Sequence, residues 1–320
     1  MKNVSNRDAN DASLNQQQGH TAAVQRQVSL AGVGAQAAVK PRTSVWKRFR
    51  RHTLALIGLV TIVILAVLSL AAPVLTQQSP YSTDLQSISQ SPSSTYWLGT
   101  DATGRDVFSR MLYAGRVSLS VGVSVVLISL VVGMSLGAVA GYFGGFTDAA
   151  IMRFVDVVLS FPSVLIIITL IAMLGPSLFN LILVMGLLNW PPITRLLRAD
   201  FLSLRERDYV LAARSIGAPA GRLVIRHMLP NAMAPIIVAA TFGVASAILL
   251  EAGLSFLGLG VQMPTPSWGN MLSSAQSLTV LDRMPWLWIP PGIMIALAVL
   301  AINFIGDGLR DALDPRMRSR

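Results

Sequence analysis

The string GTDATGRD, residues 99–106, gathers acidic and basic side chains in a stretch rich in turn-forming residues. A calcium-binding loop of the EF-hand type has alternating acids, a glycine at its sixth position and a closing glutamate. Those features are missing here, so we predict no metal site at Asp101, Arg105 and Asp106. The string instead predicts a structural cap, from which a helix begins near Asp106. Four apolar side chains are expected on an interfacial face of that helix: Val107, Phe108, Met111 and Leu112.

Other residue types that catalyse reactions or bind metals are scarce. The chain has no cysteine, and its three histidines lie far apart in the sequence, which excludes disulfides, thiolate sites and the usual spacing of histidine ligands. A P-loop for ATP hydrolysis requires G-x4-G-K-[ST], but the only lysines are Lys2, Lys40 and Lys47, and none follows a glycine-rich strand. We therefore predict no catalytic residue, no metal and no cofactor in this chain.

The composition identifies the medium in which the chain folds. Of its 320 residues, 53% are hydrophobic and 12% are charged, with a mean hydropathy of +0.60, whereas about a quarter of the residues in a soluble domain are charged. About 20 apolar residues cross a bilayer as a helix. The sequence predicts an all-α membrane protein with about six such helices, and counts of five or seven remain open. The six segments are 54–75, 117–142, 151–174, 178–193, 232–254 and 286–305.

The basic residues orient these segments. Twenty-one of the 25 Lys and Arg residues fall in the stretches 1–53, 143–153, 195–230 and 306–320. The other four are Arg105, Arg110, Arg116 and Arg283. Because positive residues collect on the cytoplasmic side, both termini and the 195–230 loop are predicted to be cytoplasmic.

This pattern divides the chain into four parts. Residues 1–43 are polar and aperiodic, which predicts a disordered cytoplasmic tail. Residues 44–116 comprise a basic amphipathic stub, the first membrane helix and an external loop. Residues 117–310 form the core membrane domain, and residues 311–320 form a cytoplasmic C-terminal tail.

Two further features of the predicted spans leave alternatives open. Gly133, Gly137, Gly141 and Gly145 are four residues apart and form a stripe that allows close approach of another helix, either inside the bundle or from another subunit. Glu251 is an acid in the 232–254 segment, near its outer end. It either lines a transport path or joins neighbouring helices through hydrogen bonds.

The 195–230 loop contains an ordered helix pair. A first helix is predicted over 200–216, ending at Gly217 as a C-terminal capping glycine. Pro219 then suits the first turn of a second helix, which is expected to end before Pro230. Such an ordered, basic and half-apolar element indicates a docking surface for a partner, and the alternative is a positively charged loop that only packs beneath the membrane.

The pattern L-A-A-x3-G-x9-H-x-L-P, residues 211–230, resembles the cytoplasmic E-A-A-x3-G-x9-I-x-L-P loop of permeases in ATP-binding-cassette importers. Leu211 replaces the glutamate of that loop and His227 replaces its isoleucine, so any ion pair from the glutamate position is absent. The resemblance implies that this loop forms coupling helices that dock on the ATPase subunit. The residues to which this role carries over are Leu211, Ala212, Ala213, Gly217, Leu229 and Pro230.

Further motifs resemble the second permease of the dipeptide, oligopeptide and nickel importer group. They are WLGTDATGRDVFSRMLYAGRVSL (97–119), AGYFGG (140–145), MRFVDVVLSFP (152–162), LSFLGLGVQMPTPSWG (254–269) and GDGLRDALDP (306–315). The resemblance implies a type I importer permease in a bacterial inner membrane that carries peptides, with nickel, glutathione-like peptides and some sugars as alternatives. Its implied partners are a homologous permease, two ATPases that bind ATP and magnesium, an external substrate-binding protein and membrane lipid, with no nucleic acid. Asp101, Arg105 and Asp106 would then cap the outer gate or contact the binding protein.

Two other classes of function fit the sequence less well. An ion-driven transporter or channel predicts several ionisable residues along a path or discontinuous helices at the midplane, and only Glu251 is available. An intramembrane enzyme requires a constellation such as H-E-x-x-H or paired acids, and the predicted spans contain neither.

Overall fold

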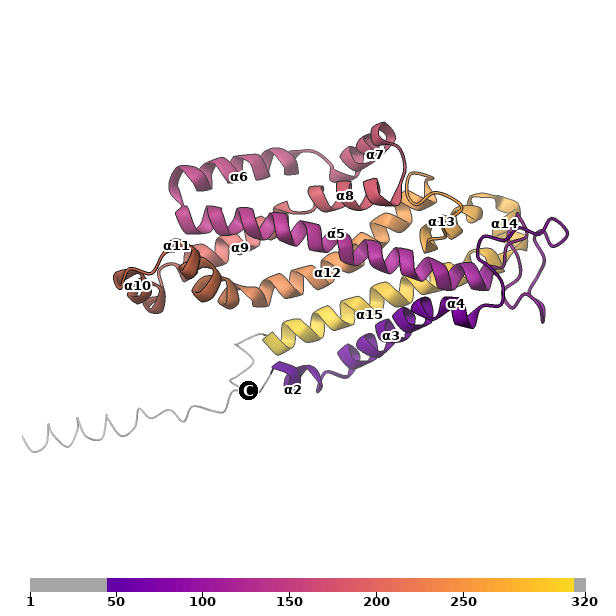
Figure 1. Cartoon of the computed structure of the whole chain (residues 1–320), viewed down its shortest axis with the longest axis horizontal. Helices are drawn as coiled ribbons and strands as arrows, with labels where there is room; N and C mark the ends of the chain where they lie inside the picture. Colours follow the sequence, from indigo (N-terminus) through magenta and orange to yellow (C-terminus); the bar gives the residue numbers. More distant parts are fainter. Residues whose placement is uncertain (1–44, 314–320) are drawn as a thin grey trace, which may run out of the picture. The chain divides into compact units, whose positions relative to one another are not determined.

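The computed structural model describes residues 45–313, so the expected N-terminal tail and most of the expected C-terminal tail lie outside the described residues. The regular secondary structure of the described part is helical apart from one isolated bridge between Thr100 and Asp106. Its helices in chain order (Figure 1) are α2 (Val45–Phe49), α3 (Thr53–Leu70), α4 (Ala72–Leu75), α5 (Val107–Phe143), α6 (Gly145–Ser160), α7 (Ser163–Leu174), α8 (Leu178–Leu188), α9 (Pro191–Leu204), α10 (Asp208–Ser215), α11 (Ala220–Arg222), the π-helix η1 (Leu223–Met228), α12 (Leu229–Phe256), α13 (Trp268–Leu272), the 3-10 helix η2 (Ser273–Gln276), α14 (Leu278–Arg283), the 3-10 helix η3 (Pro285–Leu287) and α15 (Ile289–Leu313).

The structure has four or five candidate spans where about six were expected, and five is one of the counts that the sequence left open. Within residues 45–313, four helices are long and apolar enough to cross a membrane, namely Thr53–Leu70, Val107–Phe143, Ala220–Phe256 and Pro285–Leu313. The predicted 151–174 span is broken between α6 and α7, which are bent by 80°, and counting this pair as one span gives five. Pro162 explains the break, because a proline disfavours helical backbone at the residue before it, here Phe161.

The expected span over 178–193 is not one helix. Helix α8 has eleven residues, which is too short to cross a bilayer, and the chain breaks at Asn189 before α9 begins. Asn189 donates from both its backbone N and its side-chain Nδ2 to the carbonyl of Met185, at 3.1 and 2.8 Å. Pro191 and Pro192 have no N–H with which to continue the ladder of α8, so the chain restarts as α9. Together α8 and α9 run along α5 in the same direction as α5 (Figure 1).

Helix α5 begins ten residues earlier than the predicted 117–142 span. Asp106 is its N-cap and accepts a hydrogen bond from the backbone N of Ser109 at 2.8 Å, which confirms a helix start near Asp106. The expected interfacial face is wrong, however. Val107, Met111 and Leu112 are buried, because α13 and α15 pack over this end of the helix.

The glycine stripe on α5 is filled by α9. A Cβ atom at Gly137 would lie 2.8 Å from the carbonyl oxygen of Thr194, and one at Gly141 would lie 2.5 Å from Cβ of Phe201. The hydroxyl of Thr194 donates to the carbonyl of Gly133 at 3.0 Å. Gly133, Gly137 and Gly141 therefore pack against a helix of the same bundle, as one of the two alternatives predicted. The other alternative, a contact with another subunit, is wrong for these three residues.

We expect Gly137→Val to destabilise the fold by about 1–3 kcal/mol, because the added atoms overpack a backbone contact that cannot yield. The matched control is Gly253→Val in α12, where an added Cβ meets nothing within 4 Å. Thermal unfolding of the purified protein in detergent measures both variants. Equal melting temperatures for the two would contradict this description of the α5–α9 contact.

Candidate coupling surface and transmembrane cavity

The 195–230 stretch contains most of α9, all of α10, α11 and η1, and the first residues of α12, in place of the expected two helices. The predicted helix over 200–216 is divided, since α9 ends at Leu204 and α10 begins at Asp208. Between them the chain turns through Arg205–Arg207, and the backbone of Arg207 is extended. The second helix does not end before Pro230. It continues through η1 into α12, because a π-helical turn widens the helix before the proline and accommodates a residue without an N–H.

Gly217 forms the corner that follows α10. Its φ angle is +80°, which confirms the expected capping glycine, and its backbone N donates to the carbonyl of Arg214 at 3.0 Å. Ala218 N donates to the carbonyl of Ala213 at 3.1 Å, which closes the end of the helix. A Cβ at Gly217 would meet nothing within 4 Å. The need for glycine here is therefore conformational rather than steric.

The two alanines of the motif lie on different sides of α10. Ala213 is half-buried and packs against the cluster that contains Val210, Leu223 and Phe201, so part of its side chain is used inside the fold, and its contact with a partner stays a prediction. Ala212 is exposed instead. The reason is that Val210 and Ala213 are three residues apart and share the face that packs on η1 and α9.

An apolar surface remains exposed around this corner. We name it the α10 surface and define it as Tyr209, Leu211, Ala212, Ile216 and Ile225. Ile216 is 86% exposed and Ile225 is 67% exposed. Tyr209 and Ile225 were not identified from the sequence as part of this surface. Each is adjacent in the chain to a residue of the buried face, Val210 or Val224, and this adjacency places it away from that face. Leu229 is half-buried and Pro230 exposed, at the start of α12.

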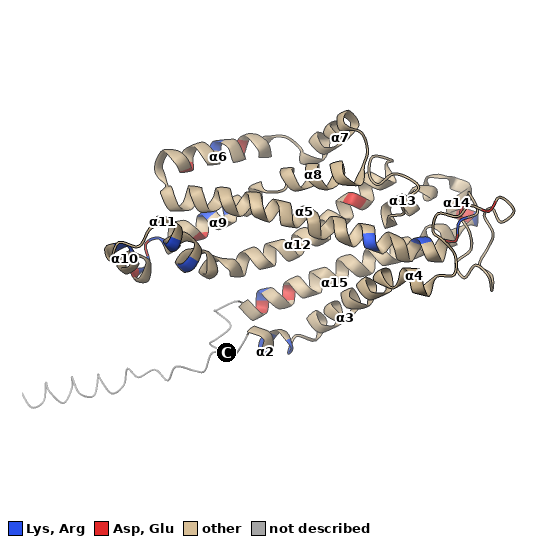
Figure 2. Cartoon of the chain, viewed as in Figure 1, with Lys and Arg blue, Asp and Glu red and all other residues tan. Residues whose placement is uncertain are grey.

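Arginines occur along the segments that carry and adjoin the α10 surface, as the blue segments near α9–α11 in Figure 2 show. The guanidinium of Arg214 lies 5.8 Å from the ring centroid of Tyr142 at the end of α5. Arg198 of α9 donates from Nε and Nη2 to the two carboxylate oxygens of Asp148 in α6. These contacts join α10 to α5 and join α9, which leads into α10, to α6.

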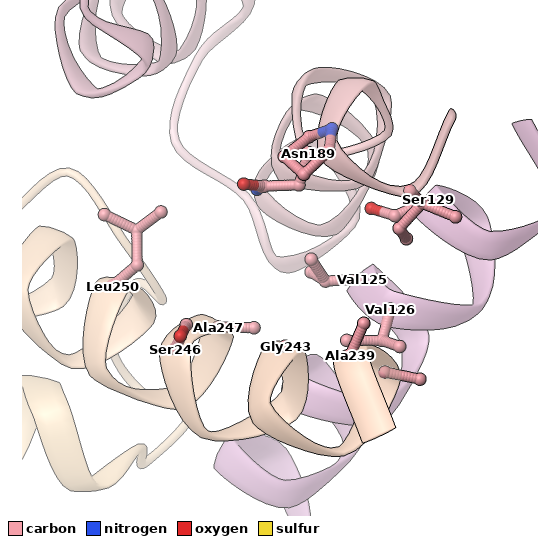
Figure 3. A pocket seen from close by; sticks show the side chains of 12 residues that line it. Val125, Val126, Ser129, Asn189, Ala239, Gly243, Ser246, Ala247 and Leu250 are labelled. Carbon is pink, nitrogen blue, oxygen red and sulfur yellow. The ribbon is translucent and has the colours of Figure 1, made fainter. Parts of the chain in front are cut away.

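A cavity of about 220 Å³ lies between α5, the α8–α9 junction and α12. Figure 3 shows Asn189 and Ser129 on one side of it and Gly243, Ser246 and Leu250 on the other. The Ser129 hydroxyl donates to the carbonyl of Gly186 at 2.9 Å. The described residues that line the cavity include no acid or base, so its wall is apolar with a few neutral polar groups.

Glu251 is completely buried but does not line this cavity. Its carboxylate accepts hydrogen bonds from the hydroxyls of Ser118 at 3.0 Å and Ser255 at 2.7 Å. The Ser118 oxygen also accepts the backbone N–H of Trp268 at 3.2 Å. These bonds join α5, α12 and α13, so Glu251 occupies a junction between helices.

The outer string forms an ion cluster. Asp101 accepts from Nε of Arg105 at 2.8 Å, and Nε of Arg110 lies 3.5 Å from the same oxygen. Burial raises the pKa of Asp101, but hydrogen bonds from Thr103 and Arg105 outweigh burial and keep this pKa below its ordinary value. Burial raises the pKa of Asp106 above its ordinary value. Among the described residues, no group of three or more His, Cys, Asp or Glu side chains is placed to hold a metal ion.

Comparison with known proteins decides the family. The model of the binding-protein-dependent transport system inner membrane component matches residues 133–319, which is more than half of the chain. The chain belongs to this family of permeases. The N-terminal transmembrane domain of oligopeptide transport permease C matches residues 40–92.

Relatives of this permease are similar over most of their length. The dipeptide transport system permease protein of Alkalihalophilus pseudofirmus is 44% identical over 282 residues, covering 88% of this chain and 92% of the relative. The di/tripeptide transport system permease protein of Pseudomonas aeruginosa is 41% identical, covering 87% and 93%. The oligopeptide transport system permease protein of Bacillus subtilis is 39% identical, covering 87% and 92%.

A solved structure shares the fold of the permease. The inward-facing methionine ABC transporter MetNI contains a chain that matches with a TM-score of 0.51 at 17% identity, covering 64% of this chain and 96% of that chain. The expected family and the type I importer permease fold are thus confirmed, and the chain is a transmembrane permease subunit of an ABC importer.

Proposed function

We propose that this permease forms half of the translocation path of a peptide importer, and that separate ATPase subunits dock on the α10 surface. The peptide cargo is supported by the relatives, whose names specify dipeptides, tripeptides and oligopeptides at 39–44% identity. The neutral wall of the cavity near Asn189 suits cargo with varied side chains, because a buried lining charge would favour one sign of charge. A homologous permease supplies the other half of the path.

The α10 surface is the observation that carries the proposal. It exposes Ile216 and Ile225 beside several arginines at the cytoplasmic end assigned by the basic residues. A contiguous apolar surface with a polar rim is typical of a protein interface. Its helix is closed by a glycine corner and packed on the bundle, so it presents one fixed shape to a partner.

The energy for transport comes from the partner subunits in this proposal. The three lysines of the chain stand outside any P-loop, so ATP and magnesium belong to the ATPases and this chain needs no cofactor of its own. An external substrate-binding protein delivers the cargo at the opposite end. The permease lies in a bacterial inner membrane with both termini in the cytoplasm.

Topology tests the orientation. Reporter fusions after residues 90 and 270 are expected to report an external position, and fusions after residues 145, 215 and 318 a cytoplasmic one, because 21 of the 25 Lys and Arg residues lie on the latter side. A cytoplasmic result at residue 270 would contradict this orientation.

Substitution of Gly217 tests whether the ATPase docks on the α10 surface. Gly217→Val is expected to reduce recovery of the ATPase with the purified permease at least tenfold and to abolish peptide uptake, because a β-branched residue strongly disfavours a φ of +80° and re-aims α10. Gly221→Val is the matched control, since a Cβ meets nothing within 4 Å at either glycine and only Gly217 has a positive φ. The control is expected to retain uptake.

Ala212→Trp tests the same surface without changing the backbone. Ala212 is exposed, so the tryptophan is expected to leave the melting temperature and membrane abundance unchanged while ATPase recovery falls. Full ATPase recovery and transport in both Gly217→Val and Ala212→Trp would show that α10 is only a loop beneath the membrane.

A further inference from the structure

A second cavity, of about 260 Å³, lies at the opposite end of the bundle from the α10 surface. It opens between the 99–106 string, the start of α5 and the α13–η2 segment. Two of the side chains that line it are nearly inaccessible arginines, since Arg105 is 6% exposed and Arg110 is 2% exposed. The remaining lining residues are Asp101, Ala102, Thr103, Val107, Met263, Asn270, Met271, Ser273, Ser274 and Leu287.

The two arginines share a single carboxylate in this cavity. Arg105 donates from Nε to Asp101 at 2.8 Å and from Nη2 to Sδ of Met263 at 3.5 Å. Arg110 donates from Nη1 to the carbonyl of Pro80 at 3.1 Å, and its Nε lies 3.5 Å from Asp101. A guanidinium carries five N–H donors. Each arginine therefore retains donors beyond these bonds.

Asp101 cannot neutralise both arginines. Its Oδ1 accepts three further hydrogen bonds, from Thr103 N at 2.8 Å, Thr103 Oγ1 at 2.7 Å and Arg105 N at 3.1 Å. No other acid is among the described residues that line the cavity. Asp106, the next acid along the chain, does not line it and uses one oxygen to cap α5. The lining thus carries one positive charge in excess.

Apart from Thr103, whose hydroxyl donates to Asp101, the other polar side chains of the wall are already bonded to backbone carbonyls. Asn270 Nδ2 donates to Val261 and Thr265, Ser273 donates to Asn270, and Ser274 donates to Met271. The free donors of the wall are therefore those of the arginines. Paired guanidinium donors match the geometry of a carboxylate better than that of a neutral ligand.

We propose that this cavity binds a carboxylate side chain presented by the external substrate-binding protein. The inference rests on the proposed function, which places this end of the bundle outside the cell. The cavity shares no lining residue with the transmembrane cavity, so it is a separate site. The 76–106 segment also exposes large apolar side chains that suit a protein partner: Tyr81, Leu85, Ile88 and Trp97.

Ala102 offers a test that removes no existing contact. It is exposed and lines the cavity, so Ala102→Glu supplies a carboxylate from within the chain, and Ala102→Gln is a neutral control of the same size. The affinity of the purified external binding protein for the complete importer in lipid nanodiscs is the measurement. Ala102→Glu is expected to weaken binding about tenfold, because it occupies the arginines, whereas Ala102→Gln stays within about twofold.

A second variant tests whether the loss of binding in Ala102→Glu depends on the arginines. Arg105→Gln alone is expected to weaken binding similarly, and adding Ala102→Glu to it is expected to cause little further loss, since coupled residues are not additive. Equal affinities for Ala102→Glu and Ala102→Gln would overturn the inference. So would a loss of uptake in Ala102→Glu with unchanged affinity, because the carboxylate would then belong to the cargo.

Recovery of the ATPase separates this inference from the proposed function. Ala102 lies at the end of the bundle opposite α10, so ATPase recovery and basal ATP hydrolysis are expected to be unchanged in both Ala102 variants. Failure of the ATPase to associate with the unmodified permease would refute the proposed function. Normal ATPase recovery with equal binding-protein affinities would refute only the carboxylate site.

Discussion

The close approach of α5 and α9 is the constraint on which the rest of this permease depends. Gly133, Gly137 and Gly141 let the backbone of α9 lie against α5, and a single Cβ at any of them would meet α9 atoms at 3 Å or less. In a bilayer, where burial of apolar surface between helices gains little, such close packing is a main source of helix association. The position of α9 then fixes where α10 emerges.

Helix α5 connects both ends of the molecule. Its 37 residues extend from the cap at Asp106 to the corner at Gly144. Near the first end, the Glu251 network joins α5 to α12 and α13. Near the end at Gly144, α5 contacts α9 along the glycine stripe. Residues of α5 and α9 also line the transmembrane cavity, so the α10 surface is joined through α9 to the helices that form this cavity.

Local rules predicted part of this structure well. The apolar segments, the N-cap at Asp106 and the glycine corner at Gly217 each depend on a few adjacent residues, so the sequence sufficed for them. The family motifs were also recognisable in the sequence. The placement of Asp101, Arg105 and Asp106 in one cap was expected, but the cavity between Arg105 and Arg110 was not, since α13 and η2 complete it from a distant part of the chain.

Tertiary packing decided the features that the sequence did not show. The span over 178–193 is different, because its break at Asn189 is local and depends on a bond to Met185 and on two prolines, which the hydropathy of the segment does not register. Val107 and Met111 have the periodicity of an interfacial face, and only the packing of α13 and α15 buries them. Ala212 and Ala213 are identical in type, and the position of η1 selects Ala213 for the buried side.

The absence of cysteine from the sequence permits one direct measurement of the central claim, that an ATPase covers the α10 surface. A single Ile216→Cys permease would be labelled with a hydrophilic maleimide, with and without bound ATPase. Leu278→Cys is the control, because Leu278 is 82% exposed in α14, near the opposite end (Figure 1). ATPase binding is predicted to slow labelling at position 216 at least tenfold and to leave position 278 unchanged. Equal labelling rates at position 216 with and without the ATPase would contradict the account.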